Sequence, residues 1–361
     1  MSFLQKNNSL LYLIITIISF AILFFGGCEK DAITPNDIDF DKIPYKTLSE
    51  YGFFTGNLSE MNPSEKVLPY QPVSQLFSDY AEKSRFVWMP QGVSANISEE
   101  ENLQIHFPDK SILIKNFYYP EAENGKQRII ETRLLMKKQG KWQAYAYIWN
   151  DEQTEATYKI TGANIPVSFT HGGEQHDITY IQPNKNQCKS CHNQKEQLMP
   201  IGPKARNLNY DFDYGEGEVK NQLTKWQETG YLNNFSNPKS YPCMVDYTDE
   251  SADLNLRAKA YLDINCGHCH SAVSPASTSG LFLTYEQEDM TKWGVYKPPV
   301  AAGIGAGSFK YDIHPGKGDE SIFVHRMKST HPAVMMPEIG RIMVHQEGVA
   351  LIREWIDEMQ L

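Results

Sequence analysis

The sequence predicts an α+β protein of several domains, in which a β-rich sheet or sandwich comes first and α-helical regions follow. Three observations lead to this fold class. The chain has 361 residues, more than a single domain usually holds. Apolar residues alternate with period two in the first half of the chain, and near the C-terminus they recur at helical spacing.

The clearest predicted strand is 141–149. Its two alternating sets of side chains are Trp142, Ala144, Ala146 and Ile148, and Tyr145, Tyr147 and Trp149. A second apolar run, 129–136, is separated from it by residues 137–140, which end in a glycine and predict a hairpin turn. Residues 111–119 form a third strand, and His171-Gly172-Gly173 marks another turn. We expect the aromatic side chains of these strands to form core rather than a binding platform.

Helical spacing is strongest in the last third of the chain. Apolar stripes run through 254–262, directly before Cys266, and through 349–359. Residues 319–327 form a shorter predicted helix between them, and 221–229 form another, which Gly230 ends.

The N-terminus predicts export. An apolar run at 10–25 is too short for a membrane span, which needs about 20 residues. Two glycines and Cys28 follow, so the segment resembles a bacterial lipoprotein signal. The resemblance implies cleavage before Cys28, lipidation of that cysteine and a membrane-anchored protein on the periplasmic or cell-surface side. An uncleaved anchor helix is the alternative.

These patterns divide the chain into five parts. They are a signal peptide (1–27), a polar tether (28–45), a β-rich module (46–185), a region around the first cysteine motif (186–250) and a C-terminal domain (251–361).

The formal net charge is 34 minus 44, or -10. A nucleic-acid-binding protein needs a basic face, so this charge argues against a nucleic-acid partner. An acidic surface suits docking to a basic protein, although it also serves simply to keep a protein soluble.

Four of the six cysteines lie in two C-x-x-C-H motifs, Cys188–His192 and Cys266–His270. Cysteines three apart place both sulfurs on one side of a helical turn, where they form thioethers to the two vinyl groups of a haem. The histidine that follows ligates the iron. We therefore expect two covalent c-type haems, attached through Cys188, Cys191, Cys266 and Cys269. Cys243 is left over and is expected to be a buried apolar thiol.

Two other kinds of site, zinc sites and thioredoxin-like redox motifs, also use paired cysteines. Zinc is held by such pairs, but it does not require a histidine after both of them. A thioredoxin-like redox motif needs a surrounding βαβ pattern, which is absent from the sequence around either pair.

Most of residues 47–361 resemble a group of di-haem c-type cytochromes, often lipoproteins, whose function is poorly defined. The resemblance depends on LSEYGFF (48–54), LFSDYAEKSRFVW (76–88), IETRLL (130–135), YIWNDEQ (147–153), QCKSCH with IGPKARNLN (187–209) and MMPEIGR (335–341). It implies a β-rich module followed by helical, cytochrome c-like haem regions. The C-terminal part resembles a class I cytochrome c, in which the first and last helices cross.

The iron ligands follow in part from the motifs. His192 and His270 are the expected proximal ligands. For the second haem, Met336 precedes Pro337 and resembles the Met-Pro loop of class I cytochromes, which implies that it is the distal ligand. Met335 is the nearest alternative. The remaining candidates are His331 and His345, each of which is expected to be a surface residue.

The distal ligand of the first haem stays open at this point. Met199 lies only 7 residues after His192, which leaves little chain to reach across a haem. Met244, His171 and His176 are further candidates, and an open sixth position is another.

The sequence therefore favours a membrane-tethered di-haem electron carrier that works with a redox partner, which is a dehydrogenase, an oxidase or another cytochrome. The first alternative is a peroxidase-like enzyme with an open first haem. The second is a cytochrome carried to a surface or glycan by the β-rich module.

Overall fold

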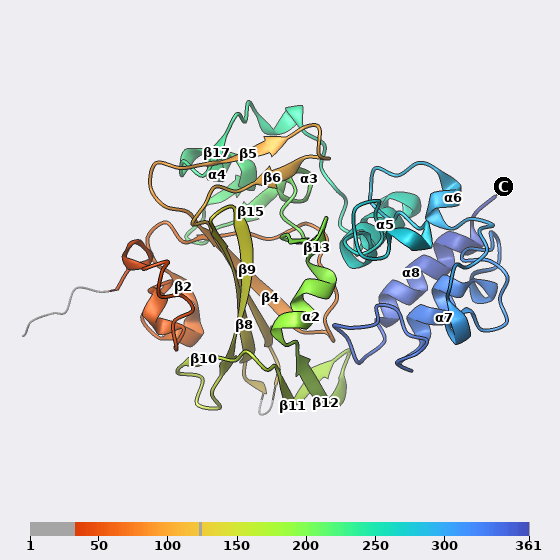
Figure 1. Ribbon diagram of the computed structural model, residues 1–361, viewed down its shortest axis with the longest axis horizontal. Helices are drawn as coiled ribbons and strands as arrows, with labels where there is room; N and C mark the ends of the chain where they lie inside the picture. Colours follow the sequence, from red (N-terminus) through yellow and green to blue (C-terminus); the bar gives the residue numbers. More distant parts are fainter. Residues whose placement is uncertain (1–32, 123–124, 361) are drawn as a thin grey trace, which may run out of the picture.

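A six-stranded antiparallel sheet lies at the centre of the larger part of the molecule (Figure 1). The structure is a computed structural model that describes residues 33–122 and 125–360. In spatial order the strands are β10 (Ala156–Tyr158), β9 (Lys141–Trp149), β8 (Arg128–Lys138), β7 (Ile112–Tyr119), β4 (Glu82–Trp88) and β3 (Leu68–Pro69). The predicted strands at 111–119, 129–136 and 141–149 are confirmed as β7, β8 and β9.

The alternation along β9 separates the two faces of this sheet. Tyr145, Tyr147 and Trp149 pack with the N-terminal segment in one core, which also contains Tyr51 and Phe53. Ala144 and Ala146 point to the other face and line a cavity. The aromatic residues of β9 are thus core, as expected, whereas the small residues opposite them leave space.

Smaller sheets surround the central one. A long hairpin, β11 (Ala163–His171) with β12 (Glu174–Gln182), turns at the predicted glycines. The short hairpins are β1 (Phe54–Thr55) with β2 (Asn62–Pro63), β13 (Asn193–Gln194) with β14 (Gln197–Leu198), and β15 (Asp211–Asp213) with β16 (Val219–Asn221).

A further sheet joins segments that are far apart in the sequence. β17 (Leu232–Asn233) pairs in parallel with β5 (Ala95–Ser98), which pairs with β6 (Gln104–His106). Between β12 and β17 lie the α-helices α2 (Lys185–Cys191), α3 (Ala205–Leu208) and α4 (Gln222–Glu228). Leu223 and Trp226 of α4 are fully buried in one core with residues of β5, β6 and β7.

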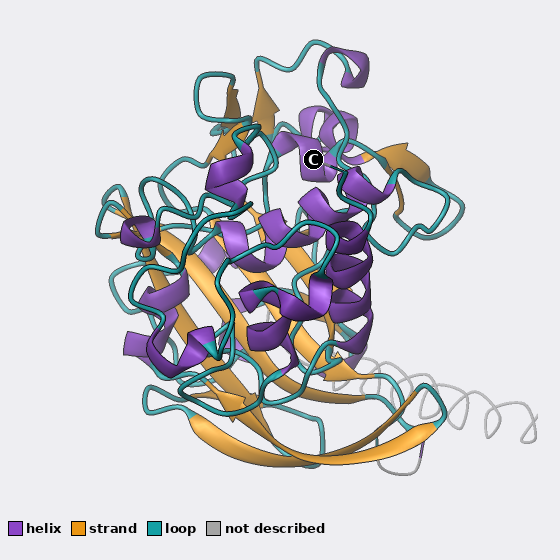
Figure 2. Ribbon diagram, turned by 90° about the vertical axis from the view of Figure 1, so that its right-hand side faces the viewer, coloured by secondary structure: helices purple, strands orange, loops and turns teal. Residues whose placement is uncertain are grey.

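The C-terminal part is packed around α5 (Leu254–Leu262) and α8 (Gln346–Asp357), which contact each other, and Figure 2 shows helices in front of the strands of the sheet. The shorter α6 (Met290–Trp293) and α7 (Ile322–Lys328) complete it. Where α8 contacts α5, a Cβ on Gly348 would overlap the Tyr261 hydroxyl, so only glycine fits there. Asp79, before β4, accepts hydrogen bonds from the backbone N–H groups of Ile342 and Met343, each 2.8 Å long.

The predicted fold class is wrong. The structure is β-rich with several sheets, at 24 % helix and 26 % strand, and it does not show the helical cytochrome c-like regions that were expected after the β-rich module. Around the first motif, short strands alternate with helices of at most seven residues, and β17 returns to pair with β5. After 251, the described chain has only three α-helices of seven residues or more, and loops rich in glycine and proline lie between them.

The predicted signal peptide (1–27), Cys28 and the first residues of the tether lie outside the described residues. Within 33–122 and 125–360, no helix combines the length and apolar character needed to cross a membrane.

Candidate functional site

The first C-x-x-C-H motif lies on a short helix whose two ends are fixed by neighbouring residues. The side chain of Asn184 accepts hydrogen bonds from the backbone N–H groups of Asn186 and Gln187 and so caps α2. Cys188 and Cys191 lie on the last turn of α2, and His192 is its C-terminal cap. At this i, i+3 spacing the two sulfurs project from neighbouring positions on one side of the helix.

The second motif follows α5 through a π-turn, Asp263–Gly267. The backbone N–H of His270 donates to the carbonyl of Cys266, so the motif closes one further turn. Gly267 is required here because a Cβ would lie 2.8 Å from the carbonyl oxygen of Leu283. Asn265 accepts a hydrogen bond from the backbone N–H of Phe77, which connects this turn to the segment before β4.

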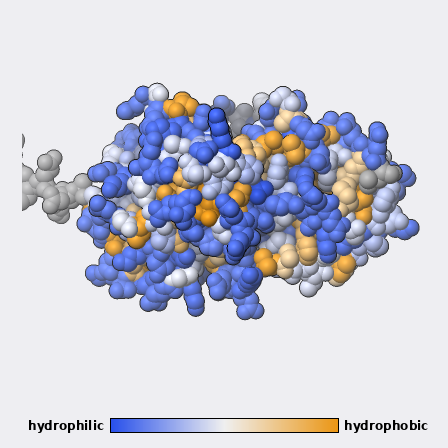
Figure 3. Space-filling model, turned by 90° about the horizontal axis from the view of Figure 1, so that it is seen from above, coloured by the Kyte–Doolittle hydropathy of each residue, from blue (hydrophilic) through white to orange (hydrophobic). Residues whose placement is uncertain are grey.

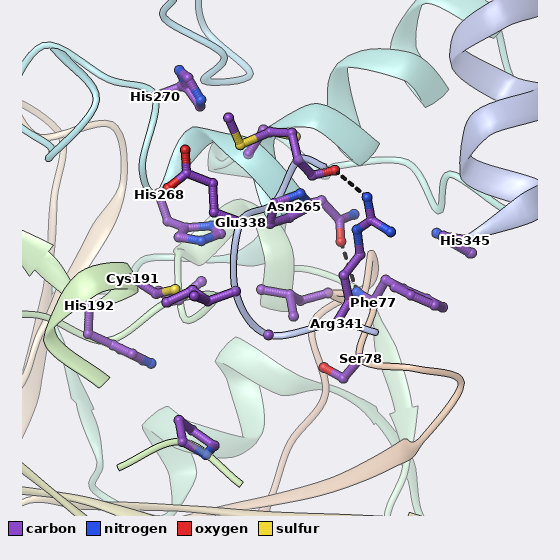
Figure 4. Close-up of a pocket in the computed structure, with 18 of the residues that line it drawn as sticks. Phe77, Ser78, Cys191, His192, Asn265, His268, His270, Glu338, Arg341 and His345 are labelled. Atoms are coloured by element: carbon purple, nitrogen blue, oxygen red, sulfur yellow. Dashed lines mark hydrogen bonds between the residues drawn. The ribbon is translucent and has the colours of Figure 1, made fainter. Parts of the chain in front are cut away.

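The fold brings the two motifs together. The ligand atoms of Cys191, His268 and Cys269 all lie within 4.8 Å of one another. Figure 4 shows Cys191 beside His268, with His192 and His270 on opposite sides of them. The backbone N–H of Lys195 donates to the carbonyl of Val273, 3.0 Å away, so the chain segments that follow the two motifs are also paired.

A cavity of about 510 Å³ contains both motifs. This volume lies in the range of roughly 300–1,000 Å³ that is usual for cofactor sites. Its apolar walls come from the central sheet and from the segment before α8, and its lining includes Leu113, Leu135, Ala144, Met335, Met336 and Pro337. The cavity is therefore large enough for a cofactor and mainly apolar, as a porphyrin ring requires.

His192 is oriented as a metal ligand would be. Its Nδ1 lies 2.8 Å from the carbonyl oxygen of Met199, so the ring donates its Nδ1 proton to the backbone and leaves Nε2 free. Burial lowers the pKa of His192 to about 3, which keeps the imidazole neutral at physiological pH. The neutral ring is the form that binds iron.

His270 is held in the same way. Its Nδ1 lies 3.3 Å from the hydroxyl of Ser279, and that hydroxyl donates its own proton to the carbonyl of Ala276. The hydroxyl oxygen is therefore an acceptor for Nδ1–H, and Nε2 is again free. Burial lowers the pKa of His270 to about 4. Both motifs thus fit a haem: two adjacent cysteines, a neutral oriented imidazole and an apolar cavity.

Met335 and Met336 both line this cavity. Met335 is almost fully buried, and the carbonyl of Met336 accepts a hydrogen bond from Arg341 that fixes the loop. The structure therefore places both candidate thioether ligands in the wall of the cavity that His270 also lines.

We predict that Met336→Ala removes the weak sulfur-to-iron charge-transfer band at the red end of the visible spectrum and lowers the reduction potential of the second haem. A thioether stabilises ferrous iron, so its loss favours the ferric state. Absorption spectra of the oxidised protein and a redox titration measure both effects. Met335→Ala is the matched control and should keep the band; the reverse pattern would assign the ligand to Met335.

The candidates for the first haem's distal ligand do not reach the cavity. Met199 is bound through its backbone to the proximal ring itself. Of the residues that the structure describes, those lining the cavity do not include Met244, His171 or His176. None of the distal-ligand candidates that the sequence offered for a haem at the first motif therefore lies in the wall of this cavity.

Sequence reasoning missed or misplaced three side chains. His268, inside the second motif, has a buried Nδ1 with no hydrogen-bond partner and lies beside Cys191. His345 was expected at the surface, but its side chain is only 11 % exposed, lines the cavity and stacks on Phe77 at 4.2 Å. Cys243 was expected to be buried, and it is exposed. Motif spacing alone carries no information on such long-range neighbours.

No protein-family model, curated protein or solved structure matches this chain.

Proposed function

We propose that this protein is a di-haem c-type cytochrome that transfers electrons to or from a redox partner. The observation that supports this function best is the contact between the two motifs, with the sulfurs of Cys191 and Cys269 among atoms within 4.8 Å of one another. Haems attached through these sulfurs have edges close together. Electron tunnelling weakens steeply with distance, so such an arrangement allows rapid exchange between two irons.

The chain's own residues would hold the two haems and tune the reduction potentials of their irons. Cys188, Cys191, Cys266 and Cys269 would form the thioethers, and the Nε2 atoms of His192 and His270 would bind the irons. A haem supplies an iron that changes between the ferrous and ferric states. The apolar walls exclude water, and fewer water molecules around a haem mean a smaller reorganisation energy when its iron gains or loses an electron.

The net charge of -10 suits a basic redox partner. On the face shown in Figure 3, hydrophilic residues cover most of the surface and hydrophobic ones form small groups. Docking guided by charge is therefore favoured over docking through a large apolar patch. The rate of electron exchange with a basic partner should fall as salt concentration rises.

A peroxidase-like enzyme is the second candidate, and the distal side of the first haem favours it, because the predicted ligands do not line the cavity there. We nevertheless expect electron transfer without substrate turnover. A peroxidase needs, besides an open iron, an acid–base residue placed close to that iron to move protons. The test is hydrogen peroxide consumption by the fully and half-reduced protein with a reduced cytochrome as donor. Two results together would favour the peroxidase over the electron carrier. They are a turnover of about 10 per second, a median value for enzymes, and carbon monoxide binding at the first iron.

A metal other than iron has one observation in its favour, the group Cys191, His268 and Cys269. Three such ligands and a water form a zinc site, but the same two sulfurs cannot then bind haem. Metal analysis of the purified protein distinguishes the two: iron supports the cytochrome, and zinc without iron contradicts it.

We propose further that the protein is exported and held at a bacterial membrane through lipid on Cys28, as the signal-like sequence suggests. Cys28→Ser should move the protein to the soluble fraction or leave an uncleaved precursor, as judged by fractionation and the mass of the N-terminus. Wild-type protein that is wholly soluble and begins at another residue would contradict this proposal.

A further inference from the structure

Three basic residues form a row across the central sheet. Arg85 of β4 is paired with Lys115 of β7, and Lys115 is paired with Arg133 of β8. Directly paired residues point to the same face, so the three side chains project together. All three line the cavity that contains the motifs. We call these residues the basic row.

The basic row has too few negative partners. Arg133 forms an ion pair with Glu131, and Arg85 donates to the amide oxygen of Gln75 at 3.0 Å. Lys115 has no carboxylate partner among the described residues, and its ammonium group lies 4.7 Å from the ring of Phe117. The three cations of the basic row therefore share one carboxylate partner, Glu131, so the row itself has an excess of two positive charges. Asp79, Asp312 and Glu338 also line the cavity, but none of them forms an ion pair with the row.

Such a row is unfavourable in an empty cavity. Like charges directly opposite one another destabilise a sheet, and a cation removed from water needs a counter-charge. Burial and the neighbouring charges of Arg85 and Arg133 hold the pKa of Lys115 well below its ordinary value. A pair of anionic groups in the cavity would reverse these effects and keep all three side chains charged.

The first motif lies next to the row. α2 packs against β9, the strand beside β8. Burial raises the pKa of Cys188, and the positive charge of Arg133 opposes that effect. Burial lowers the pKa of His192, and the charge of Lys115 contributes to the lowering. Cys188 and His192 line the same cavity as all three residues of the basic row, so the first motif and the row face one common space.

We infer that the basic row binds the two propionate carboxylates of the haem at the first motif. The inference rests on the proposed function. A haem held by Cys188, Cys191 and His192 carries two carboxylates, which equals the excess charge of the row. Guanidinium and ammonium groups form their strongest hydrogen bonds with carboxylates, and arginine binds them in a bidentate manner. The β-rich module thereby acquires a role as the wall that holds the cofactor's charged edge.

The experiment uses the full chain with Cys188→Ala and Cys191→Ala, in which His192 still binds haem reversibly. Ferric haem and its dimethyl ester, in which both propionates are neutral, are titrated separately and followed by absorbance. We expect the free acid to bind at least about tenfold more tightly than the ester, the effect of one charged hydrogen bond of roughly 1.5–3 kcal/mol. Adding Lys115→Met should reduce this ratio to below about threefold.

Two further variants are the controls. Lys115→Arg keeps the charge and should keep the ratio. Lys141→Met removes the same charge from an exposed position on β9 that does not line the cavity, and should also leave the ratio unchanged.

Equal affinities for the acid and the ester with the row intact would overturn the inference while leaving haem binding in place. This is also the result expected if the row binds a free anion from solution. Failure of both porphyrins to bind would overturn the proposed function as well.

The melting temperature of the haem-free chain gives a second readout. Because Lys115 lacks a counter-charge there, Lys115→Met should raise the melting temperature. A lower melting temperature would identify a merely structural lysine and overturn the inference.

Discussion

Replacing Cys188 and Cys191 by alanine is expected to halve the covalently bound haem, from two per chain to one. Under the proposed function, the two sulfurs of α2 would attach the first haem, and the second motif lies on a separate turn after α5. After denaturation and acid–acetone extraction, covalent haem stays with the polypeptide, so absorbance per chain measures the change. Two haems retained in the variant would contradict attachment at this motif.

Cys243→Ala is the matched control for this experiment. The thiol is exposed and does not line the cavity, so both haems should remain. Loss of a haem on this replacement would mean that Cys243 takes part in attachment.

Gly348→Val is expected to destabilise the C-terminal part by about 3 kcal/mol, and by more if the helices cannot separate. Replacement of a helical glycine normally stabilises a helix by roughly 0.5–1 kcal/mol. Here the sign reverses because a Cβ would overlap both the hydroxyl and the ring of Tyr261. Tyr261 cannot easily move, since its hydroxyl is 3.1 Å from Nδ1 of His345 and its ring is buried.

Thermal or denaturant unfolding of the haem-loaded protein measures this effect. Ala350→Val is the control, because Ala350 lies on the exposed side of the same helix, where only the lower helix propensity of valine acts. A Gly348→Val protein as stable as this control would show that α5 and α8 are not in close contact.

Local patterns predicted the elements of this fold well and their assembly poorly. The period-two run at 141–149 is confirmed as β9, and the stripe at 254–262 is confirmed as α5. Such patterns follow from which face of an element is buried, and that is visible in neighbouring residues. The pairing of β17 with β5 joins residues more than 130 positions apart, and no local period indicates it. The helical regions that were inferred from resemblance are the part that the structure does not show.

The residues of the candidate site likewise fall into those that local sequence predicted and those that it could not predict. The motifs are local, so their cysteines and histidines were identified directly. The contact of Cys191 with His268, the buried position of His345 and the basic row depend on tertiary packing. One signal was available: Lys115 is the only charged residue of β7, and a lone charge on a buried strand often has a specific partner.

The hydrogen bonds from Ile342 and Met343 to Asp79 also bear on how the chain reaches its final structure. They join residues 263 and 264 positions apart, and the cavity is closed between these two segments. Contacts at such separation form late, because closing a long loop costs much entropy before any contact is gained. The segment that contains Ile342 and Met343 thus completes the cavity only after a long loop has closed. Until these contacts form, the cysteine thiols of the two motifs stay accessible to solvent and to any enzyme that modifies them, and slow folding lengthens that interval.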